Sequence, residues 1–381
     1  MSIETRFIEP LDVLFLRGNK LFGEPGSHGE SLVPPWPSVA AGALRSRMLA
    51  DDRVDLAAFA RGEIDHPALG TPETPGSFAV TAFHLARRFA DGRIELLIAP
   101  PADLVIGDNA GAPSVHRLQP TTLASGLQTS SSLPLLPVLA EKDRGKPVTG
   151  FWLTQTGWEK YLRGDTPGDT DLVRSSQLWA IDHRVGVGLD AQSRRAADGK
   201  LFSVQAVSMV QRQHAAAGFD VGFVASVSGA GLPVGGSVRL GGDGRAAALH
   251  ACDARLPAAD CAAIAATGRC RIVLTTPGIF ADGWRLPGVD ADGRIDLHGV
   301  RGRLVCAAVP RAETISGWDL ARNRPKPAQR VAPAGSVYWL DELDTTPSSL
   351  DKLVASGLWT DSCEDAARRA EGFNRIALAA C

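Results

Sequence analysis

The first hundred residues alternate between strand-like and helix-like segments, and their order constrains the fold more than any single motif does. Residues 7–16 are rich in Ile, Leu, Val and Phe and predict a buried strand. Residues 39–49 have apolar side chains at helical spacing and predict a helix, with Ser38 as a possible N-cap. Strands are predicted at 78–86 and 94–98, with a turn at Asp91-Gly92 between them. A strand, a helix and a hairpin in this order predict a βαββ unit of ferredoxin-like type.

The rest of the chain has an irregular middle part and a second series of strands. Residues 100–147 predict an irregular insertion, 158–162 a short helix, and the polar, basic residues 184–200 a segment that separates two regions. Further strands are predicted at 201–210, 219–227, 237–240, 246–251, 271–275, 302–309 and 336–340, and further helices at 258–266, 348–354 and 363–371. The simplest interpretation is two α+β domains in tandem, divided near residue 190.

Composition limits the classes of protein to which this chain can belong. Its 381 residues are 44% hydrophobic and 22% charged, as in globular proteins. Lys and Arg number 40 and Asp and Glu 42, so the net charge of −2 gives no global basic field for scanning nucleic acid. No apolar run approaches the roughly 20 residues that span a bilayer, and we expect a soluble, cytoplasmic protein. The six cysteines include no Cys-x-x-Cys pair, which argues against a zinc site.

Motifs that suggest enzyme chemistry are incomplete. Residues 241–245, Gly-Gly-Asp-Gly-Arg, hold one carboxylate where a two-metal site needs a pair, so they predict a hairpin turn. The chain has no Gly-Lys-Ser/Thr P-loop, and Gly186-Val187-Gly188 lacks the third glycine of a dinucleotide loop. His28 lies in a glycine-flanked segment where it could act as a general acid or base on RNA, or serve as an ordinary polar loop residue.

The helix at 39–49 offers a candidate anion-binding face. Ser38, Gly42 and Arg45 share one side of it, where Gly42 leaves room for a ligand backbone and the planar guanidinium of Arg45 suits phosphate. Helix packing through Gly42 with a solvated Arg45 explains the pattern equally well. Two basic clusters could contact a phosphate backbone or form a solvated surface: Arg184, Arg194, Arg195 and Lys200, and Arg322, Arg324, Lys326 and Arg330.

Several stretches, taken in order, resemble subunit three of the Cmr complex, the RNA-guided effector of type III-B CRISPR defence. They are residues 17–22, Pro34-Pro35-Trp36-Pro37-Ser38, residues 41–46, Arg184-Val185-Gly186-Val187-Gly188-Leu189-Asp190, residues 199–202, Ile315-Ser316-Gly317-Trp318-Asp319-Leu320, Pro325-Lys326-Pro327 and residues 333–338. The similarity covers most of the chain, and several specific strings in the same order make coincidence a poor explanation.

The resemblance implies an α+β protein of the RAMP superfamily with two tandem ferredoxin-like (RAMP/RRM-like) domains, 1–190 and 191–381, and irregular insertions. Such a subunit does no chemistry and needs no cofactor. It holds the 5′ repeat-derived handle of the guide RNA and joins the large palm-containing subunit to the backbone subunits. It is not expected to bind a membrane. The residues implied in RNA binding are Arg17, Lys20, Ser38, Gly42, Arg45, Arg184, Arg194, Arg195, Lys200, Lys326, Gly372, Asn374 and Arg375.

One departure from the family concerns the C-terminal loop. RAMP proteins commonly carry Gly-x-Gly there, whereas this chain has Gly372-Phe373-Asn374. Asn tolerates left-handed backbone conformations, so we expect the shape of the loop to survive without the close backbone approach that glycine allows.

Two other functions stay open at this point. A RAMP endoribonuclease that uses His28 would have a similar fold and similar basic patches, and so would a protein bridge that never touches RNA. Aromatic residues make up 6% of the chain, so broad base-stacking platforms are expected to be limited.

Overall fold

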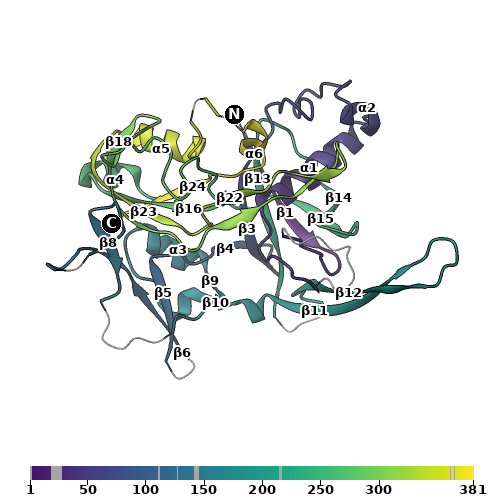
Figure 1. The fold of residues 1–381 in the computed structure, drawn as a ribbon, viewed down its shortest axis with the longest axis horizontal. Coiled ribbons are helices and arrows are strands. Elements are labelled where there is room, and N and C mark those ends of the chain that lie inside the picture. The colour runs from purple at the N-terminus through teal and green to yellow at the C-terminus, as the bar shows by residue number, and fades with distance from the viewer. Residues whose placement is uncertain are drawn as a thin grey trace. The chain divides into compact units, whose positions relative to one another are not determined.

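The computed structural model describes residues 2–18, 28–109, 112–126, 128–140, 146–213, 217–360, 362–363 and 365–381. Helices and mostly antiparallel sheets make up the structure (Figure 1). Unit 1, the first of two compact units, consists of Met1–Glu95, Ser176–Ala254 and Thr314–Gln329, and unit 2 of Leu96–Ser175, Arg255–Glu313 and Arg330–Cys381. Each unit takes segments from both halves of the chain, and the tandem domains 1–190 and 191–381 stay a prediction.

A six-stranded sheet forms the centre of unit 1. Its strands in spatial order are β14 (Gly235–Arg239), β15 (Ala246–Cys252), β1 (Ile3–Pro10), β13 (Phe219–Ser228), β3 (Ala79–Phe89) and β4 (Ile94–Leu97). β1 lies inside the sheet and runs antiparallel to both β15 and β13. The strand predicted at 7–16 therefore starts earlier, at Ile3, and ends at Pro10, which has no amide hydrogen for the ladder.

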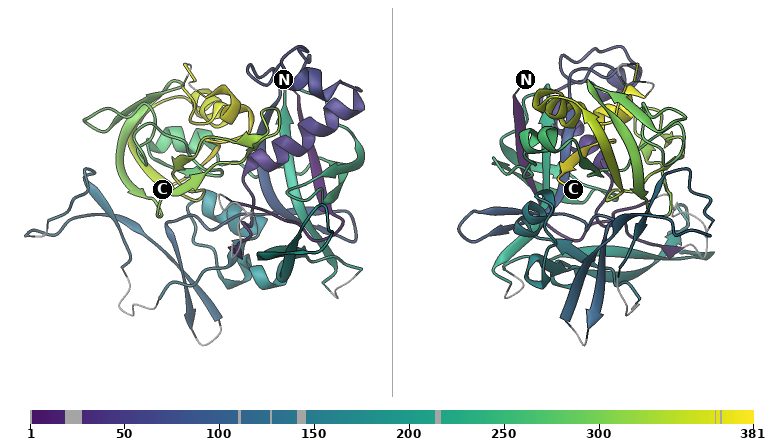
Figure 2. Two further views of the ribbon diagram at one scale, coloured as in Figure 1. Left: turned by 45° about the vertical axis from the view of Figure 1, so that its right-hand side comes forward. Right: turned by 90° about the vertical axis from the view of Figure 1, so that its left-hand side faces the viewer.

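Helix α1 (Pro37–Asp51) lies against this sheet and contacts β3 and β14 (Figure 2). Its buried side is made of Ala40, Ala41, Ala43, Leu44, Met48 and Leu49, which confirms the predicted helix. The N-cap residue is Trp36, no side chain caps the helix, and Pro37 starts it with a backbone angle that suits the first turn. The N-cap role predicted for Ser38 is therefore wrong. The short helix α2 (Leu56–Ala60) follows, capped by the carboxylate of Asp55.

Close packing in the sheet explains why residue 222 is a glycine. A Cβ atom on Gly222 of β13 would lie 2.4 Å from the carbonyl oxygen of Ile8 and 2.8 Å from the Phe7 ring. Phe7 and Ile8 are fully buried, so neither can easily move away. Glycine at this position allows the aromatic ring of β1 to lie over the neighbouring strand.

The polar segment predicted at 184–200 is a long β-hairpin. It is formed by β11 (Trp179–Leu189) and β12 (Ala196–Met209), and the short strand β2 (His28–Gly29) pairs with β12 in parallel. The hairpin extends away from the six-stranded sheet of its unit (Figure 1), and we call residues 179–209 the arm. The prediction of a separating segment missed it because its strands contain glycines and charges in place of a continuous apolar face.

Unit 2 is built on a five-stranded sheet. Its strands in spatial order are β17 (Arg294–Leu297), β18 (Val300–Ala308), β23 (Val337–Asp344), β16 (Cys270–Leu274) and β24 (Ile376–Ala379). Helix α5 (Pro347–Ser356) packs against β18 and β24 and contacts α4 (Cys261–Thr267). Leu350 and Leu353 of α5 are fully buried in this core with Ile272 and Leu340. The strands and helices predicted in this region are confirmed with shifted ends.

The segment predicted as an irregular insertion contains paired strands. The pairs are β5 (Leu104–Asn109) with β6 (Ala112–Arg117), and β7 (Gln119–Thr122) with β8 (Leu135–Val138). The remaining elements are β9 (Phe151–Leu153), α3 (Gln155–Leu162), η1 (Asp169–Asp171), β10 (Leu172–Arg174), η2 (Ser175–Gln177), β19 (Glu313–Ile315), β20 (Trp318–Asp319), β21 (Arg324–Pro325), β22 (Gln329–Val331) and α6 (Ala366–Ala370). None of the helices in the described ranges is long and apolar enough to cross a membrane.

A buried ion pair ties the C-terminal end of the chain into unit 2. Arg271, 1% exposed, lies 2.7 Å from Asp103, which also accepts a hydrogen bond from the Tyr161 hydroxyl at 2.8 Å. The Arg271 guanidinium donates to the carbonyl oxygen of Ala380 as well. Burial, and secondly the Asp103 charge, raise the pKa of Tyr161 well above its ordinary value, so the hydroxyl keeps the proton that it donates.

We predict that His84 makes unit 1 sensitive to acid. Its side chain is 7% exposed in β3, and burial lowers the pKa of the imidazole from 6.5 to about 4. Between these two values the unfolded chain binds a proton that the folded chain does not bind, so stability falls as the pH falls through this window. We expect the free energy of unfolding to drop by on the order of 3 kcal/mol from this group.

Urea denaturation at pH 7 and pH 4.5 measures this effect. His84→Leu should lose much less stability between the two pH values than the wild type, whereas His183→Leu, at an exposed position of β11, should behave like the wild type. An equal loss in His84→Leu and the wild type would contradict the assignment.

Candidate nucleic-acid interface

The outward side of α1 forms the face predicted from the sequence. Ser38, Gly42 and Arg45 are partly exposed, while Ala40, Ala41, Ala43 and Leu44 between them are buried. A Cβ atom added at Gly42 would meet no other atom within 4 Å, so the space above the helix backbone is open. Gly42 therefore does not pack against another element in the described part of the chain. This arrangement leaves room for a ligand to approach the helix backbone.

Arg45 lies beside an aromatic ring at this face. Its guanidinium carbon is 4.9 Å from the ring centre of Phe78, which is 1% exposed. A ring in this position limits the motion of the guanidinium, so it is held beside the open surface. Arg47, two residues further, pairs with Asp51 at 2.7 Å and donates to the carbonyl oxygen of Ser237 in β14, which fixes the helix to the sheet.

Arg17 has an acidic partner in the turn at 241–245. Its guanidinium lies 2.7 Å from Asp243, and both side chains are partly exposed. Gly241, Asp243 and Gly244 have positive φ angles of 75°, 57° and 67°, which confirms the predicted turn. The single carboxylate of this turn therefore serves an ion pair. Lys20 lies outside the described residues.

The arm has two chemically different faces. Because side chains alternate along a strand, Arg184, Gly186 and Gly188 share one face. A Cβ on Gly186 would come within 2.3 Å of the Phe202 ring, and one on Gly188 within 3.0 Å of Lys200, so these side chains of β12 lie across the glycines of β11. Arg184 pairs with Asp182 at 2.8 Å.

The opposite face of the arm is aliphatic and exposed. Val187 lies opposite Leu201 in the strand register, and Val185 and Leu189 are two residues away along β11. Their exposed fractions are 73% for Val185, 44% for Val187, 63% for Leu189 and 60% for Leu201. Water contact with four neighbouring aliphatic side chains is unfavourable, and such a patch typically marks a contact surface.

The tip of the arm presents two cations. Asp190 accepts hydrogen bonds from the backbone and hydroxyl of Ser193 and from the amide of Gln192, which lowers the pKa of its carboxyl and fixes the turn. Arg194 and Arg195 are exposed, and within the described ranges their side chains make no hydrogen bond or ion pair. They are therefore available to an anionic ligand.

The C-terminal loop is buried in unit 2. Asn374 has a φ of 61°, which confirms the left-handed conformation expected of it, and it is 1% exposed. Its side-chain oxygen accepts from the amide of Ile279 at 2.6 Å. Arg375 is 7% exposed, and burial, with a smaller effect of Arg369, lowers the pKa of its guanidinium to about 10. Gly372 is buried as well, and contact of these residues with RNA stays a prediction.

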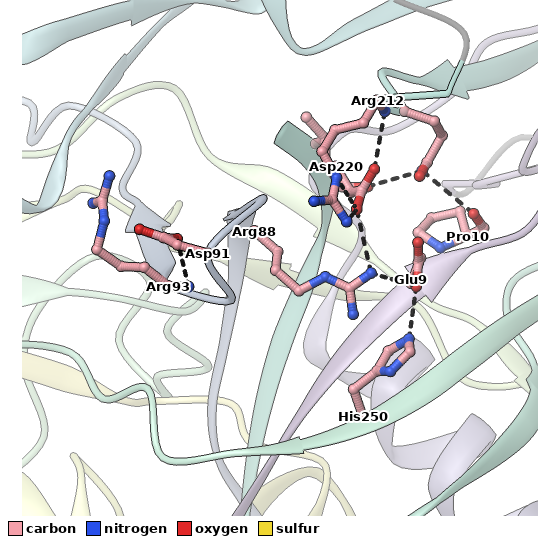
Figure 3. A network of polar contacts seen from close by, with 10 residues as sticks. Glu9, Pro10, Arg88, Asp91, Arg93, Arg212, Asp220 and His250 are labelled. Atoms are coloured by element: carbon pink, nitrogen blue, oxygen red, sulfur yellow. Dashed lines mark hydrogen bonds and ion pairs between the residues drawn. The ribbon is translucent and has the colours of Figure 1, made fainter. Parts of the chain in front are cut away.

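Sequence reasoning missed a polar network on the six-stranded sheet of unit 1 (Figure 3). Glu9 lies 2.6 Å from His250 and 2.8 Å from Arg88, and Arg88 lies 3.2 Å from Asp220. Arg212 pairs with Asp220 at 2.8 Å. Single charged residues in otherwise apolar strands were the available signal, but the partners come from four distant segments. Because acids and bases alternate, the network neutralises itself.

No group of three or more His, Cys, Asp or Glu side chains that could hold a metal ion occurs among the described residues. His28 belongs to β2, where its backbone pairs with Ser203 of the arm. Lys326 follows β21, and its amide donates to the carbonyl oxygen of Gly317 at 2.8 Å.

A family model for the CRISPR-associated protein Cas_Cmr3 matches residues 6–380. The chain belongs to the Cas_Cmr3 family. This membership confirms the resemblance to subunit three of the Cmr complex.

Comparison with solved structures finds chains of the type III-B Cmr-beta complex determined by cryo-electron microscopy. In the complex bound to cognate target RNA and AMPPnP, state 1, the similar chain has a TM-score of 0.45 and 14% identity, over 92% of this chain and 88% of that chain. In the complex bound to cognate target RNA, the values are 0.42 and 13%, with the same coverage. No curated protein sequence matches.

We predict that Asn374 stabilises the C-terminal loop through both its side chain and its backbone. Asn374→Gly keeps the left-handed conformation but leaves the partly buried amide of Ile279 without its acceptor, which should cost about 1–3 kcal/mol. Asn374→Ala should cost about 1–2 kcal/mol more, because alanine is strained at this φ. Chemical denaturation of the three proteins measures both effects.

Asn323 provides the matched control, since it is also left-handed, with a φ of 48°, but exposed. Asn323→Gly should leave stability nearly unchanged. An Asn374→Gly variant as stable as the wild type would show that the side chain is dispensable for the loop.

Proposed function

We propose that this chain is a non-catalytic subunit of a type III-B CRISPR (Cmr) effector complex in the cytoplasm. In this role it binds the 5′ repeat-derived handle of the guide RNA and bridges the large palm-containing subunit and the backbone subunits. Membership of the Cas_Cmr3 family supports the assignment to this complex. The proposed RNA-binding and bridging roles rest on one observation. The arm has cations on one face and at its tip, and it has exposed aliphatic side chains on the other face.

The RNA-binding part of the proposal rests on exposed cations and an open helix surface. Arg194 and Arg195 at the tip of the arm have no internal partner among the described residues, and Lys200 extends along Gly188 on the basic face. At α1, Arg45 is held beside the open surface over Gly42. Guanidinium groups in fixed positions suit phosphate oxygens, and such contacts orient RNA without reading its sequence.

The bridging part rests on the aliphatic face of the arm. Aliphatic side chains offer no ring on which a base could stack, so Val185, Val187, Leu189 and Leu201 fit a protein surface better than they fit RNA. With cations on one face and aliphatic groups on the other, the arm can contact RNA and a neighbouring subunit at the same time.

The proposal includes two ferredoxin-like domains. In unit 1, four neighbouring strands lie in the spatial order β15-β1-β13-β3. Along the chain, α1 connects the first of them, β1, to the second, β3. In unit 2, four neighbouring strands lie in the spatial order β24-β16-β23-β18. If the strands of each unit are numbered along the chain, both spatial orders read fourth, first, third, second. In unit 2, α5 and α6 connect the third strand, β23, to the fourth, β24. This shared order supports two related domains, each with one of the two helical connections of a βαββαβ unit.

We predict that Arg45→Ala weakens RNA loading without unfolding the chain. Loss of one phosphate contact should lower the slope of the logarithm of affinity against the logarithm of salt concentration by roughly 0.7. Arg45→Lys should restore part of the affinity, because it keeps the charge but not the planar fork. Arg61→Ala, at the exposed end of α2, is the control and should bind as the wild type does.

Titration of labelled guide RNA into the assembled complex at several salt concentrations gives both quantities. An Arg45→Ala variant with unchanged affinity and unchanged salt slope would remove α1 from the RNA-binding surface. Cleavage of repeat RNA by the purified chain, lost in His28→Ala, would contradict the non-catalytic role.

We predict that the aliphatic face of the arm is needed for assembly and not for RNA binding. Val185→Ser with Leu201→Ser should lower the association constant with the other Cmr subunits by about tenfold or more, because burying one such side chain contributes about 1.5–3 kcal/mol. Arg194→Ala with Arg195→Ala should show the opposite pattern, with weaker RNA binding. Sedimentation of the reconstituted complex measures assembly, and unimpaired assembly of the serine variant would contradict the bridging role of this face.

A further inference from the structure

A short hairpin in unit 1, distant in sequence from the arm and from α1, carries the most exposed tryptophan of the chain. It is formed by β20 and β21, with Trp318 opposite Pro325 and Asp319 opposite Arg324. The amide of Lys326 donates to the carbonyl oxygen of Gly317 at 2.8 Å, and the Ser316 hydroxyl donates to the carbonyl oxygen of Lys326 at 2.7 Å. These bonds close the open end of the hairpin, so its few residues have a defined conformation.

Arg322 braces the hairpin. Its guanidinium lies 2.8 Å from Asp319 within the hairpin and 2.9 Å from Glu73 in the segment before β3. Burial acts to raise the pKa of Asp319, but the hydrogen bonds from Arg322 outweigh it and lower the pKa, so this carboxylate stays charged and paired. Arg322 is thus used internally, and two carboxylates share its single positive charge. The charge of Lys326 also acts on Asp319 and lowers the pKa of its carboxyl further.

The exposed side of the hairpin is apolar. Trp318 is 48% exposed, against 37% for Trp284 and less than 9% for Trp36, Trp152, Trp158, Trp339 and Trp359. Directly opposite residues of an antiparallel pair point to the same side, so Trp318 and the exposed Pro325 lie next to each other. Leu320, two residues along, is 74% exposed. A large ring that the fold could have buried is instead held at the surface.

Two further cations lie in strand β21 or directly after it. Arg324 is exposed, and in the described part of the structure its side chain has no hydrogen bond or ion pair. Lys326 is partly exposed between Pro325 and Pro327, which restrict the backbone here. Sites for single-stranded nucleic acid typically combine an aromatic face, on which a base stacks, with cations along the path of the backbone.

We propose that Trp318, with Pro325 beside it, is a stacking platform for one unpaired nucleobase of single-stranded RNA, and that Arg324 and Lys326 contact the adjoining phosphates. This inference rests on the proposed function, because it assumes that the chain binds RNA. A protein partner could also cover a tryptophan. Arg322, Arg324 and Lys326 outnumber the nearby acids Asp319 and Glu73, and Arg324 has no ion pair among the described residues. This charge balance favours a polyanion, whereas the arm presents an aliphatic face for protein. Bases inside a duplex do not present their faces, so the platform requires a single strand.

The test uses the full chain and a fluorescein-labelled single-stranded RNA with the sequence of the repeat, measured by fluorescence anisotropy. Trp318→Leu should weaken binding by roughly 5- to 100-fold, the effect of losing one stacked base. Its salt slope should match that of the wild type, because no charge is removed. Trp318→Phe should retain most of the affinity, since it keeps an aromatic face. Trp284→Leu, at the next most exposed tryptophan, is the matched control and should bind normally.

Arg324→Ala should produce the complementary result, a smaller loss of affinity with a salt slope lower by roughly 0.7. Equal RNA binding by Trp318→Leu and the wild type would overturn the inference and leave the proposed function intact. Unchanged RNA binding with impaired assembly into the Cmr complex would identify the platform as a protein contact and overturn it too. Failure of the wild type to bind RNA, alone and in the complex, would contradict both the inference and the proposed function.

Discussion

The pairing of the N-terminal strand with two strands near the middle of the chain holds unit 1 together. β1 takes hydrogen bonds from β13 on one edge and from β15 on the other, and the buried hydroxyls of Thr5 and Ser226 lie 3.0 Å apart across 221 residues of sequence. The proposed RNA-binding elements of this unit depend on that pairing. Leu14, just after β1, exchanges backbone hydrogen bonds with Val207 at the base of the arm, at 2.8 Å in both directions. The arm is thus anchored next to the strand that organises the sheet.

The proposed binding of a polyanion does not require a basic protein, because the charges of this chain are sorted locally. Arg88 and Arg212 are neutralised by Glu9 and Asp220 on the sheet, and Arg271 is neutralised by Asp103 in the core of unit 2. Arg194, Arg195 and Arg324 have no such partners in the described part of the chain. Although the net charge of the chain is −2, small regions of its surface therefore carry unpaired cations. Such regions suit a subunit that shares the neutralisation of RNA with others.

Local patterns predicted those elements whose side chains have a clear period. Helix α1 and strands β3, β4, β13 and β15 follow from apolar spacing, and the turn at 241–245 follows from its glycines. The arm could not be predicted in this way. The need for glycine at positions 186 and 188 is explained only by Phe202 and Lys200, which lie across them from the other strand. The ion network of unit 1 was hidden for the same reason, since its members come from four segments that only the folded sheet brings together. Among the candidate site residues, the face of α1 was predictable from helical geometry, whereas the burial of Asn374 and Arg375 was not.

Photo-crosslinking of guide RNA to the assembled complex, followed by mass spectrometry of the peptides, tests the central claim most directly. The account predicts RNA-linked peptides from residues 38–45 of α1 and from residues 184–200 of the arm, with no crosslinks to the self-neutralised network around Glu9 and Asp220. Crosslinks that map only to other subunits, or to parts of this chain outside α1, the arm and the β20–β21 hairpin, would contradict it.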